Sequence, residues 1–186
     1  MSIRRVSTAT VYENPWMRVR EDRIERADGS QGIYGVVEKP DFALVIPQER
    51  DGSLWLVEQY RYPVAGRYWE FPQGSWEHAE QVDAADLARG ELAEETGLGA
   101  GSMRHLGHLY EAYGYSTQGF DVWLATDLVQ GDARRESTEQ DMRARQVPRA
   151  EWEAMVRDGV VKDAPSLAAY GLLLTCESSS SSCPWA

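Results

Sequence analysis

Alternating apolar and polar residues predict β-structure at the start of the chain. Residues 11–26 carry β-prone side chains in alternation, and residues 33–37 are typical of a returning strand. Asp28-Gly29 between them is a turn pair, so an N-terminal antiparallel β-element is expected over residues 1–40. Residues 1–10 show no clear period and are expected to form a frayed start.

A second group of strands follows this element. Residues 42–46 form a continuous apolar run, as in a buried strand. Asp51-Gly52 then turns the chain into residues 54–60, which predicts a second strand beside the first. Residues 68–71 are expected to form a short strand leading into Pro72-Gln73-Gly74.

A helical period begins after residue 82. Asp83 is a candidate N-cap and Gly97 a candidate C-terminal stop. Between them, Glu91, Glu94 and Glu95 fall within one sector of the helix surface, because each residue turns by about 100°. Like charges at this spacing destabilise a helix unless something compensates them. These glutamates form either a solvated acidic face or the oxygen ligands of a divalent cation such as Mg²⁺.

The second half of the chain mixes strands and helices without regular alternation. Strands are expected at residues 105–113, 121–127 and 144–147, with helices at 149–157 and from Asp163 or Ser166 to residue 174. This order predicts an α+β fold, an α/β/α sandwich in which a mixed β-sheet is flanked by helices. That domain is expected over residues 41–175, followed by a flexible serine-rich tail at 176–186.

Composition and charge narrow the possible partners. The 186 residues suit one medium domain with a real core. A formal net charge of −11 without a basic stripe argues against a duplex DNA binder, so no nucleic-acid partner is expected. No apolar run is long enough to predict a membrane span. Cys176 and Cys183 lie too close to the C-terminal end to staple the core, and a reducing cytoplasm is the expected compartment.

The three glutamates are part of a longer spaced motif. Its members are Gly74, Glu80, Glu91, Glu94, Glu95, Gly97 and Leu98. The motif resembles the Nudix box, in which a glycine and a glutamate precede Arg-Glu-x-x-Glu-Glu-x-Gly and an aliphatic residue. Two departures stand out: the linker between Glu80 and Glu91 is two residues longer than the pattern, and Gly90 stands where the family has arginine.

The resemblance implies a metal centre on this helix. Glu91 and Glu95 would be the principal ligands of Mg²⁺ or Mn²⁺, Glu94 would contribute, and Gly74 belongs to the same site. Glu91 is counted among the catalytic residues as well. Helical carboxylates one turn apart can hold metal ions that neutralise a diphosphate and activate water. We expect Gly90 to alter the surroundings of the metal without abolishing its binding.

Motifs outside the box point to one branch of the family. Residues 57–63 (VEQYRYP), 69–74 (WEFPQG) and 159–168 (GVVKDAPSLA) resemble ADP-ribose pyrophosphatases. The implied reaction is metal-dependent hydrolysis of a nucleoside diphosphate linked to a sugar, with ADP-ribose giving AMP and ribose 5-phosphate. The N-terminal sheet of that branch commonly forms a homodimer, so residues 11–40 are the expected dimer element.

Four residues are assigned to the nucleotide substrate. Arg61 would bind a phosphate or position a carboxylate, and Glu70 would contact the metal or a ribose. Trp16 and Tyr115 offer aromatic faces on which an adenine-like ring could stack. Each has a structural alternative, such as a surface arginine on a strand or an aromatic side chain that only packs.

The general base is expected in the acidic loop at residues 136–141. Glu139 is the first choice and Glu136 the second, because the branch is thought to use a glutamate from a mobile loop late in the fold. A solvated loop acid is the alternative for each. Glu80 would either support the box loop or join the metal site, and His78 is expected to face solvent.

Two further changes leave the substrate open. Gln73 stands where the branch has alanine, and Ser116-Thr-Gln-Gly119 replaces its usual Ser-Pro-Gly loop. Another nucleotide sugar or a dinucleoside polyphosphate therefore also fits the motif. A Nudix-fold domain that binds or senses a nucleotide without cleaving it is the alternative from a different class, favoured by Gly90. A purely structural acidic helix is the third reading.

Overall fold

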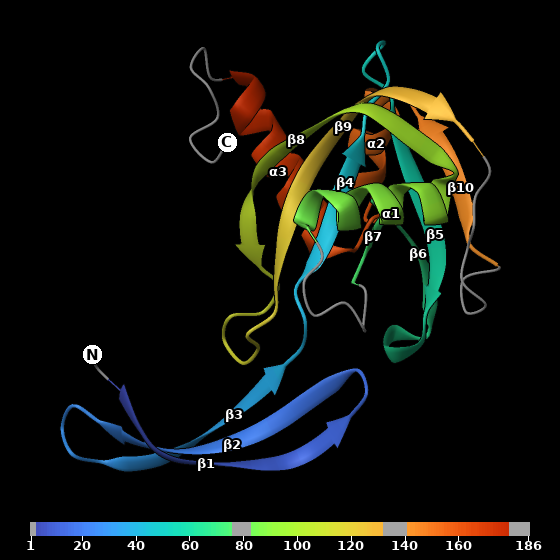
Figure 1. The fold of residues 1–186 in the computed structure, drawn as a ribbon. Helices are drawn as coiled ribbons and strands as arrows, with labels where there is room; N and C mark the ends of the chain where they lie inside the picture. The colour runs from blue at the N-terminus through green and yellow to red at the C-terminus, as the bar shows by residue number, and fades with distance from the viewer. Residues whose placement is uncertain (1–2, 76–82, 132–140, 179–186) are drawn as a thin grey trace. The chain divides into compact units, whose positions relative to one another are not determined.

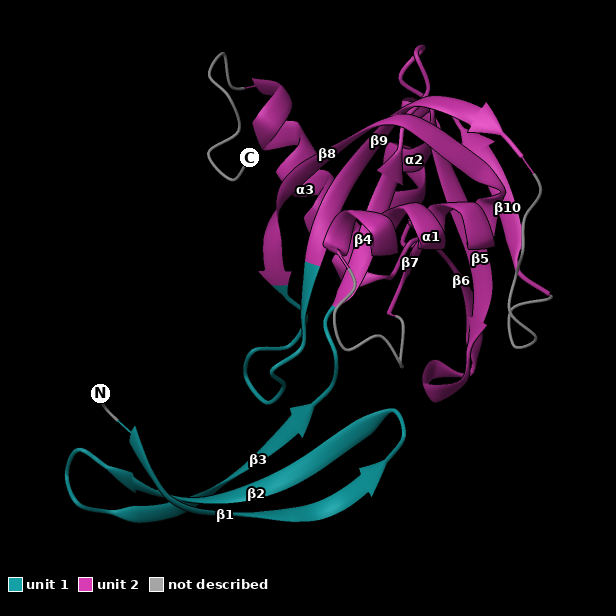
Figure 2. Cartoon of the chain, viewed as in Figure 1, with its two compact units in different colours: residues 1–41, 110–120 teal, residues 42–109, 121–186 magenta. Residues whose placement is uncertain are grey.

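The computed structural model describes residues 3–75, 83–131 and 141–178, and the chain divides into two compact units (Figure 2). Unit 1 comprises residues 1–41 and 110–120, and unit 2 comprises residues 42–109 and 121–186. The first unit therefore includes a segment, residues 110–120, that interrupts the sequence of the second unit.

Unit 1 is built on a three-stranded antiparallel sheet (Figure 1). Its strands are β1 (Ile3–Asn14), β2 (Met17–Arg26) and β3 (Gln31–Glu38), in that spatial order. The side chain of Asn14 accepts the backbone N–H groups of Trp16 and Met17, at 2.9 and 2.8 Å, and so closes the first turn.

The expected frayed start at residues 1–10 is wrong, because β1 begins at Ile3 and pairs with Arg26 there. Two register shifts interrupt this pairing, and every β1 residue except Asn14 is exposed. A strand without a buried face has no reason to alternate apolar and polar residues. Its sequence therefore carries no strand period.

The aromatic segment 110–120 joins unit 1 through backbone hydrogen bonds. Val37 donates its N–H to the carbonyl of Tyr115 at 2.8 Å, and Thr117 donates its N–H to the carbonyl of Val37 at 3.0 Å. The hydroxyl of Tyr34 donates to the carbonyl of Gly114 at 2.7 Å. These bonds attach the segment to β3, although it lies between two strands of unit 2 in the sequence.

Unit 2 contains two further sheets (Figure 1). A four-stranded sheet has the order β7-β4-β9-β8, and a three-stranded sheet has the order β10-β5-β6. The strands are β4 (Phe42–Pro47), β5 (Leu54–Arg61), β6 (Gly66–Glu70), β7 (Gln73–Gly74), β8 (Leu98–Tyr110), β9 (Gly119–Gln130) and β10 (Arg143–Val147). A single turn of 3₁₀ helix, Tyr62–Val64, links β5 to β6.

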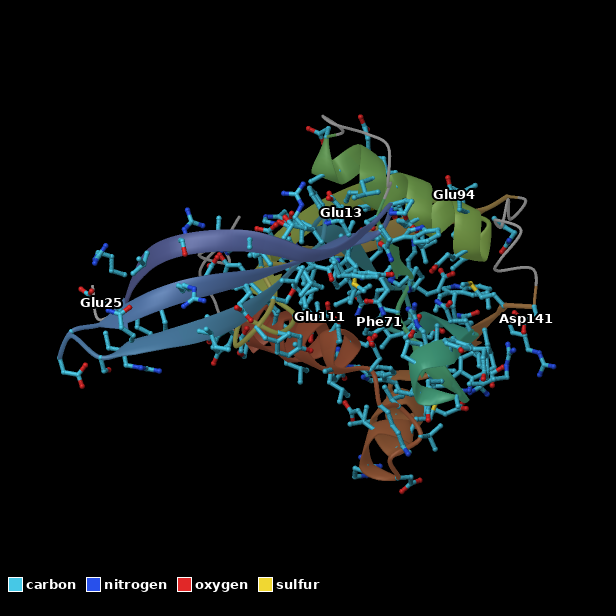
Figure 3. The ribbon with its side chains drawn as sticks, turned by 90° about the horizontal axis from the view of Figure 1, so that it is seen from below. Glu13, Glu25, Phe71, Glu94, Glu111 and Asp141 are labelled. Atoms are coloured by element: carbon cyan, nitrogen blue, oxygen red, sulfur yellow. The ribbon has the colours of Figure 1, made fainter. Side chains whose placement is uncertain are left out.

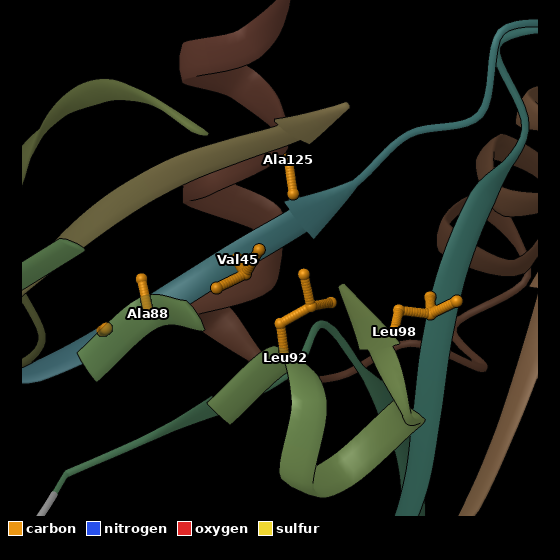
Figure 4. Packing of buried hydrophobic residues seen from close by; sticks show 6 residues of the cluster. Val45, Ala88, Leu92, Leu98 and Ala125 are labelled. Atoms are coloured by element: carbon orange, nitrogen blue, oxygen red, sulfur yellow. The ribbon is translucent and has the colours of Figure 1, made fainter. Parts of the chain in front are cut away.

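The described residues of unit 2 also form the helices α1 (Ala84–Thr96), α2 (Arg149–Arg157) and α3 (Ala164–Ser178). In Figure 1, α1 lies in front of the four-stranded sheet and α3 lies behind it. The core between α1 and this sheet is formed by Ala43, Val45, Ala88, Leu92, Leu98 and Ala125 (Figure 4). The predicted α+β fold with helices flanking a sheet is confirmed.

Local signals set both ends of α1 as expected. The side chain of Asp83 accepts the N–H of Ala85 at 2.8 Å, which satisfies one of the unpaired donors of the first turn. Gly97 adopts φ 76°, a left-handed conformation that glycine tolerates, and donates its N–H to the carbonyl of Ala93. The rotation of the glutamates around the helix is therefore well defined.

Some boundaries differ from the expectation. β8 begins at Leu98, directly after α1, because an edge strand that is half exposed shows little apolar alternation in its first residues. α3 continues to Ser178, while residues 179–186 lie outside the described part of the chain. Within the described residues, none of the helices has the length and apolar character needed to cross a membrane.

Candidate active site

The carboxylate of Glu91 lies directly against Gly74. Glu91 is 7% exposed and points from α1 toward the two-residue strand β7. A Cβ atom added to Gly74 would stand 2.5 Å from Oε2 of Glu91 and 2.7 Å from its Cδ. Only glycine leaves room for the carboxylate there, so Gly74 and Glu91 constrain each other.

Glu95 contacts the neighbouring residue of the same strand. Its side chain is 1% exposed, and its Oε2 accepts the backbone N–H of Gln73 at 3.2 Å. Because Gln73 and Gly74 are consecutive, Glu91 and Glu95 both lie against β7. That strand is held in place by antiparallel pairing of Gln73 with Leu44 in β4. The structure therefore brings these two predicted ligands together.

Glu94 is less buried than Glu91 and Glu95. It is half-buried, and Figure 3 shows it on the outer side of α1. It lines a shallow hollow of about 340 Å³, together with Gly90, Ala93, Gly97, Leu98, Gly99 and Gly131. Gly90, which replaces the arginine of the Nudix box, therefore lies beside Glu94 in this hollow and not between the helix and β7. The metal-binding role of Glu94 remains a prediction.

Arg61 and Glu70 form an ion pair in which the carboxylate is buried and the guanidinium is partly exposed. The Nε atom of Arg61 donates to Oε2 of Glu70 at 3.2 Å, and a terminal guanidinium nitrogen donates to Oε1. Gln59 donates its side-chain amide to the same Oε1 at 2.6 Å. Glu70 is 1% exposed, whereas the side chain of Arg61 is 40% exposed. The carboxylate thus anchors a guanidinium that still reaches the surface.

Burial and charge act against each other in this pair. Burial raises the pKa of Glu70 above its ordinary value, although attraction to Arg61 opposes the rise. Burial alone would lower the pKa of Arg61, but the attraction and hydrogen bonds of Glu70 raise it, with contributions from Asp163 and Glu95. The guanidinium of Arg61 therefore lies within electrostatic reach of Glu70, Asp163 and Glu95.

Asp163 also belongs to this cluster, although the sequence predicts it only as a possible start of a helix. Its Oδ2 accepts the side-chain amide of Gln73 at 3.1 Å and the backbone N–H of Ser166 at 2.9 Å. The hydroxyl of Ser166 accepts the N–H of Phe71 at 2.8 Å, so the start of α3 is tied to the segment before β7. The sequence signal for this contact was Gln73 itself, a polar residue where the ADP-ribose pyrophosphatase pattern has alanine.

The remaining predicted residues lie elsewhere. Trp16 and Tyr115 belong to unit 1 and are 56% and 60% exposed. Their role in stacking an adenine-like ring stays a prediction. Glu80, Glu136, Glu139 and His78 lie outside the described residues.

The donor atoms against β7 suit a hard divalent cation. Mg²⁺ prefers carboxylate and carbonyl oxygens, keeps several waters, and usually takes only one or two carboxylates from the protein. Glu91 and Glu95 supply two buried carboxylates, of which Glu91 packs so closely on Gly74 that a methyl group there would displace it. Within residues 3–75, 83–131 and 141–178, no group of three or more His, Cys, Asp or Glu side chains could hold a metal. Glu91 and Glu95 could therefore hold the ion together with water and other oxygen donors.

Comparison with known families agrees with this geometry. The model described as NUDIX domain matches residues 38–169, and the model described as nucleoside diphosphate sugar hydrolase N-terminal domain matches residues 3–37. The NUDIX match covers well over half of the chain. The chain therefore belongs to the Nudix family, as the box predicted.

Individual relatives point the same way. The chain is 30% identical over 169 residues to an ADP-ribose pyrophosphatase of Mycobacterium tuberculosis, covering 90% of this chain and 80% of that protein. It is 27% identical over 118 residues to an ADP-ribose pyrophosphatase of Bacillus subtilis, covering 63% of each. A crystal structure of an ADP compounds hydrolase shares the fold with a TM-score of 0.80 at 21% identity, covering 94% of both chains.

Replacing Gly74 by alanine tests the contact with Glu91. The new methyl group would collide with the carboxylate, so Glu91 has to move and Mn²⁺ affinity should fall by about 10- to 100-fold, as when a metal ligand loses its support. Titration of Mn²⁺ by electron paramagnetic resonance measures this.

Gly171→Ala is the matched control, because a Cβ at Gly171 in α3 meets nothing within 4 Å. It should leave Mn²⁺ affinity unchanged and raise the free energy of unfolding by up to about 1 kcal/mol. Wild-type Mn²⁺ affinity in Gly74→Ala would show that Glu91 is not a ligand held by this contact.

Proposed function

We propose that this protein is a metal-dependent hydrolase that cleaves the diphosphate of a nucleoside diphosphate linked to a sugar, with ADP-ribose as the best-supported substrate. The observation that carries the proposal is the pair of buried carboxylates, Glu91 and Glu95, held against β7. Membership of the Nudix family and the N-terminal match to nucleoside diphosphate sugar hydrolases support the reaction class. The name of the mycobacterial relative supports ADP-ribose in particular.

Hydrolysis requires water to attack one phosphorus while the bridging oxygen leaves with the other phosphate. ADP-ribose and water would give AMP and ribose 5-phosphate. When bound, a divalent cation neutralises the diphosphate and lowers the pKa of water. Glu91 and Glu95 would hold Mg²⁺ or Mn²⁺ on a rigid helix, with Glu94 as a further candidate.

The Arg61–Glu70 pair is proposed to bind the substrate's phosphate. A guanidinium presents planar donors that match phosphate oxygens, and the bonds from Glu70 hold it in one orientation. Glu139, or else Glu136, is proposed to take the proton from the attacking water, and Trp16 or Tyr115 to stack on the adenine.

We further propose that unit 1 forms a homodimer with a second copy of the chain. Its sheet exposes large apolar side chains that an isolated three-stranded sheet cannot bury, namely Ile3, Val6, Val11, Tyr12, Ile33 and Tyr34. Sedimentation equilibrium should therefore give the mass of two chains at micromolar concentration. The mass of one chain under these conditions would contradict the proposal.

A nucleotide-binding domain without catalysis is the second candidate. Gly90 favours it, because the helix lacks the box arginine next to Glu94. Such a domain would be stabilised against heat by a nucleotide that it does not cleave. The turnover measurement below separates the two.

Turnover of a panel of nucleoside diphosphate derivatives tests the enzyme proposal. With Mg²⁺ or Mn²⁺, the wild type should release nucleoside monophosphate from ADP-ribose or a related nucleotide sugar, and a chelator should stop the release. Glu95→Gln should lose most of this activity, because it removes a charged ligand. The experiment follows the monophosphate by chromatography.

Asp86→Asn is the matched control, since Asp86 is an exposed acid in the first turn of the same helix. It should hydrolyse the substrate as the wild type does. The enzyme proposal fails if no member of the panel is cleaved, or if Glu95→Gln is as active as the wild type.

A further inference from the structure

The side chain of Gln73 is buried beside the proposed metal site and only half of its amide is satisfied. Gln73 is 8% exposed. Its Nε2 donates to Oδ2 of Asp163 at 3.1 Å, whereas its Oε1 is buried and has no hydrogen-bond partner among the described residues. A buried acceptor without a hydrogen-bond partner destabilises a fold. An apolar side chain of similar size at position 73 would therefore give a more stable protein than Gln73 does.

The chemistry of Asp163 determines which end of the amide faces it. An ionised carboxylate only accepts hydrogen bonds, so Gln73 must present its NH₂ group. Asp163 itself is held, because the same Oδ2 accepts the N–H of Ser166 in the first turn of α3. An acid at this position also interacts favourably with the positive end of the helix dipole. The anchor for Gln73 is therefore a rigid helix start.

The main chain of Gln73 completes the connection to the metal site. Its N–H donates to Oε2 of Glu95 at 3.2 Å. A continuous chain of contacts thus runs from the start of α3, through the Asp163 carboxylate and the Gln73 side chain, to the Glu95 carboxylate on α1. A strand of only two residues has few hydrogen bonds of its own, so a side-chain anchor at one of them restrains its position.

We propose that Gln73 is a positioning residue for Glu95: the Asp163 carboxylate clamps its amide, and the clamped backbone holds the Glu95 oxygen in place for a divalent cation. The inference rests on the proposed function, because it assumes that Glu95 is a metal ligand. Asp163, at the start of α3, then helps to set the affinity of the site for the divalent cation.

Gln73→Leu is the central variant, since leucine fills similar space, keeps the backbone N–H and removes the clamp. Mn²⁺ affinity, measured without substrate, should fall by about 10- to 100-fold. Under a fixed, sub-saturating Mn²⁺ concentration kcat should fall more than KM rises, and added Mn²⁺ should restore part of kcat. If Gln73→Leu does not fold, Gln73→Ala carries the same comparison.

Two variants separate positioning from general stability. Asp163→Ala removes the oxygen that accepts the Gln73 amide, so it should lower Mn²⁺ affinity about as much as Gln73→Leu does. Ser166→Ala breaks the bond from the N–H of Phe71 to Ser166 but leaves the Gln73 clamp. It should lower the melting temperature without changing Mn²⁺ affinity.

The outcomes distinguish this inference from the proposed function. A wild type that neither binds Mn²⁺ nor cleaves any nucleotide sugar overturns both. A wild type that does both, with Gln73→Leu equal to it in Mn²⁺ affinity, overturns only the role of Gln73. An equal loss of affinity in Ser166→Ala also overturns that role, because the effect would then follow from loosening α3 in general.

Discussion

The close contact between the Glu91 carboxylate and Gly74 is the constraint on which the rest of the site depends. Burying a carboxylate is costly unless it is paired or bonded, and Glu95 accepts the backbone N–H of Gln73 in β7. The helix that carries them is held at both ends by Asp83 and Gly97 and packs on the sheet through Leu92. The fold therefore keeps the acids in place before any ligand arrives.

Two further contacts fix the strands and the helix that surround the Glu91 and Glu95 carboxylates. Arg61 and Glu70 meet on neighbouring strands, and Gln73 connects β7 to the first turn of α3. The second contact joins β7 to the start of α3, which lies ninety residues further along the chain.

The sequence predicts the features that depend on local interactions, and not those that depend on contacts between distant residues. The ends of α1 and the spacing of its glutamates were predicted, because caps and helical periodicity are local. The start of β1 was missed, because a strand exposed on both faces carries no apolar pattern. Asp163 was missed as a site residue, because its bond to Gln73 crosses ninety positions of sequence. Spacing alone also could not show that Glu94 borders a hollow while Glu91 and Glu95 are buried.

The central claim is that Glu91 and Glu95 hold a divalent cation against β7. Crystals grown with Mn²⁺ and measured at the manganese absorption edge test it most directly. We expect an anomalous peak beside Gly74, bonded to carboxylate oxygens of both glutamates. A peak bonded to Glu94 in the hollow beside Gly90 instead, or no peak near α1, would contradict it.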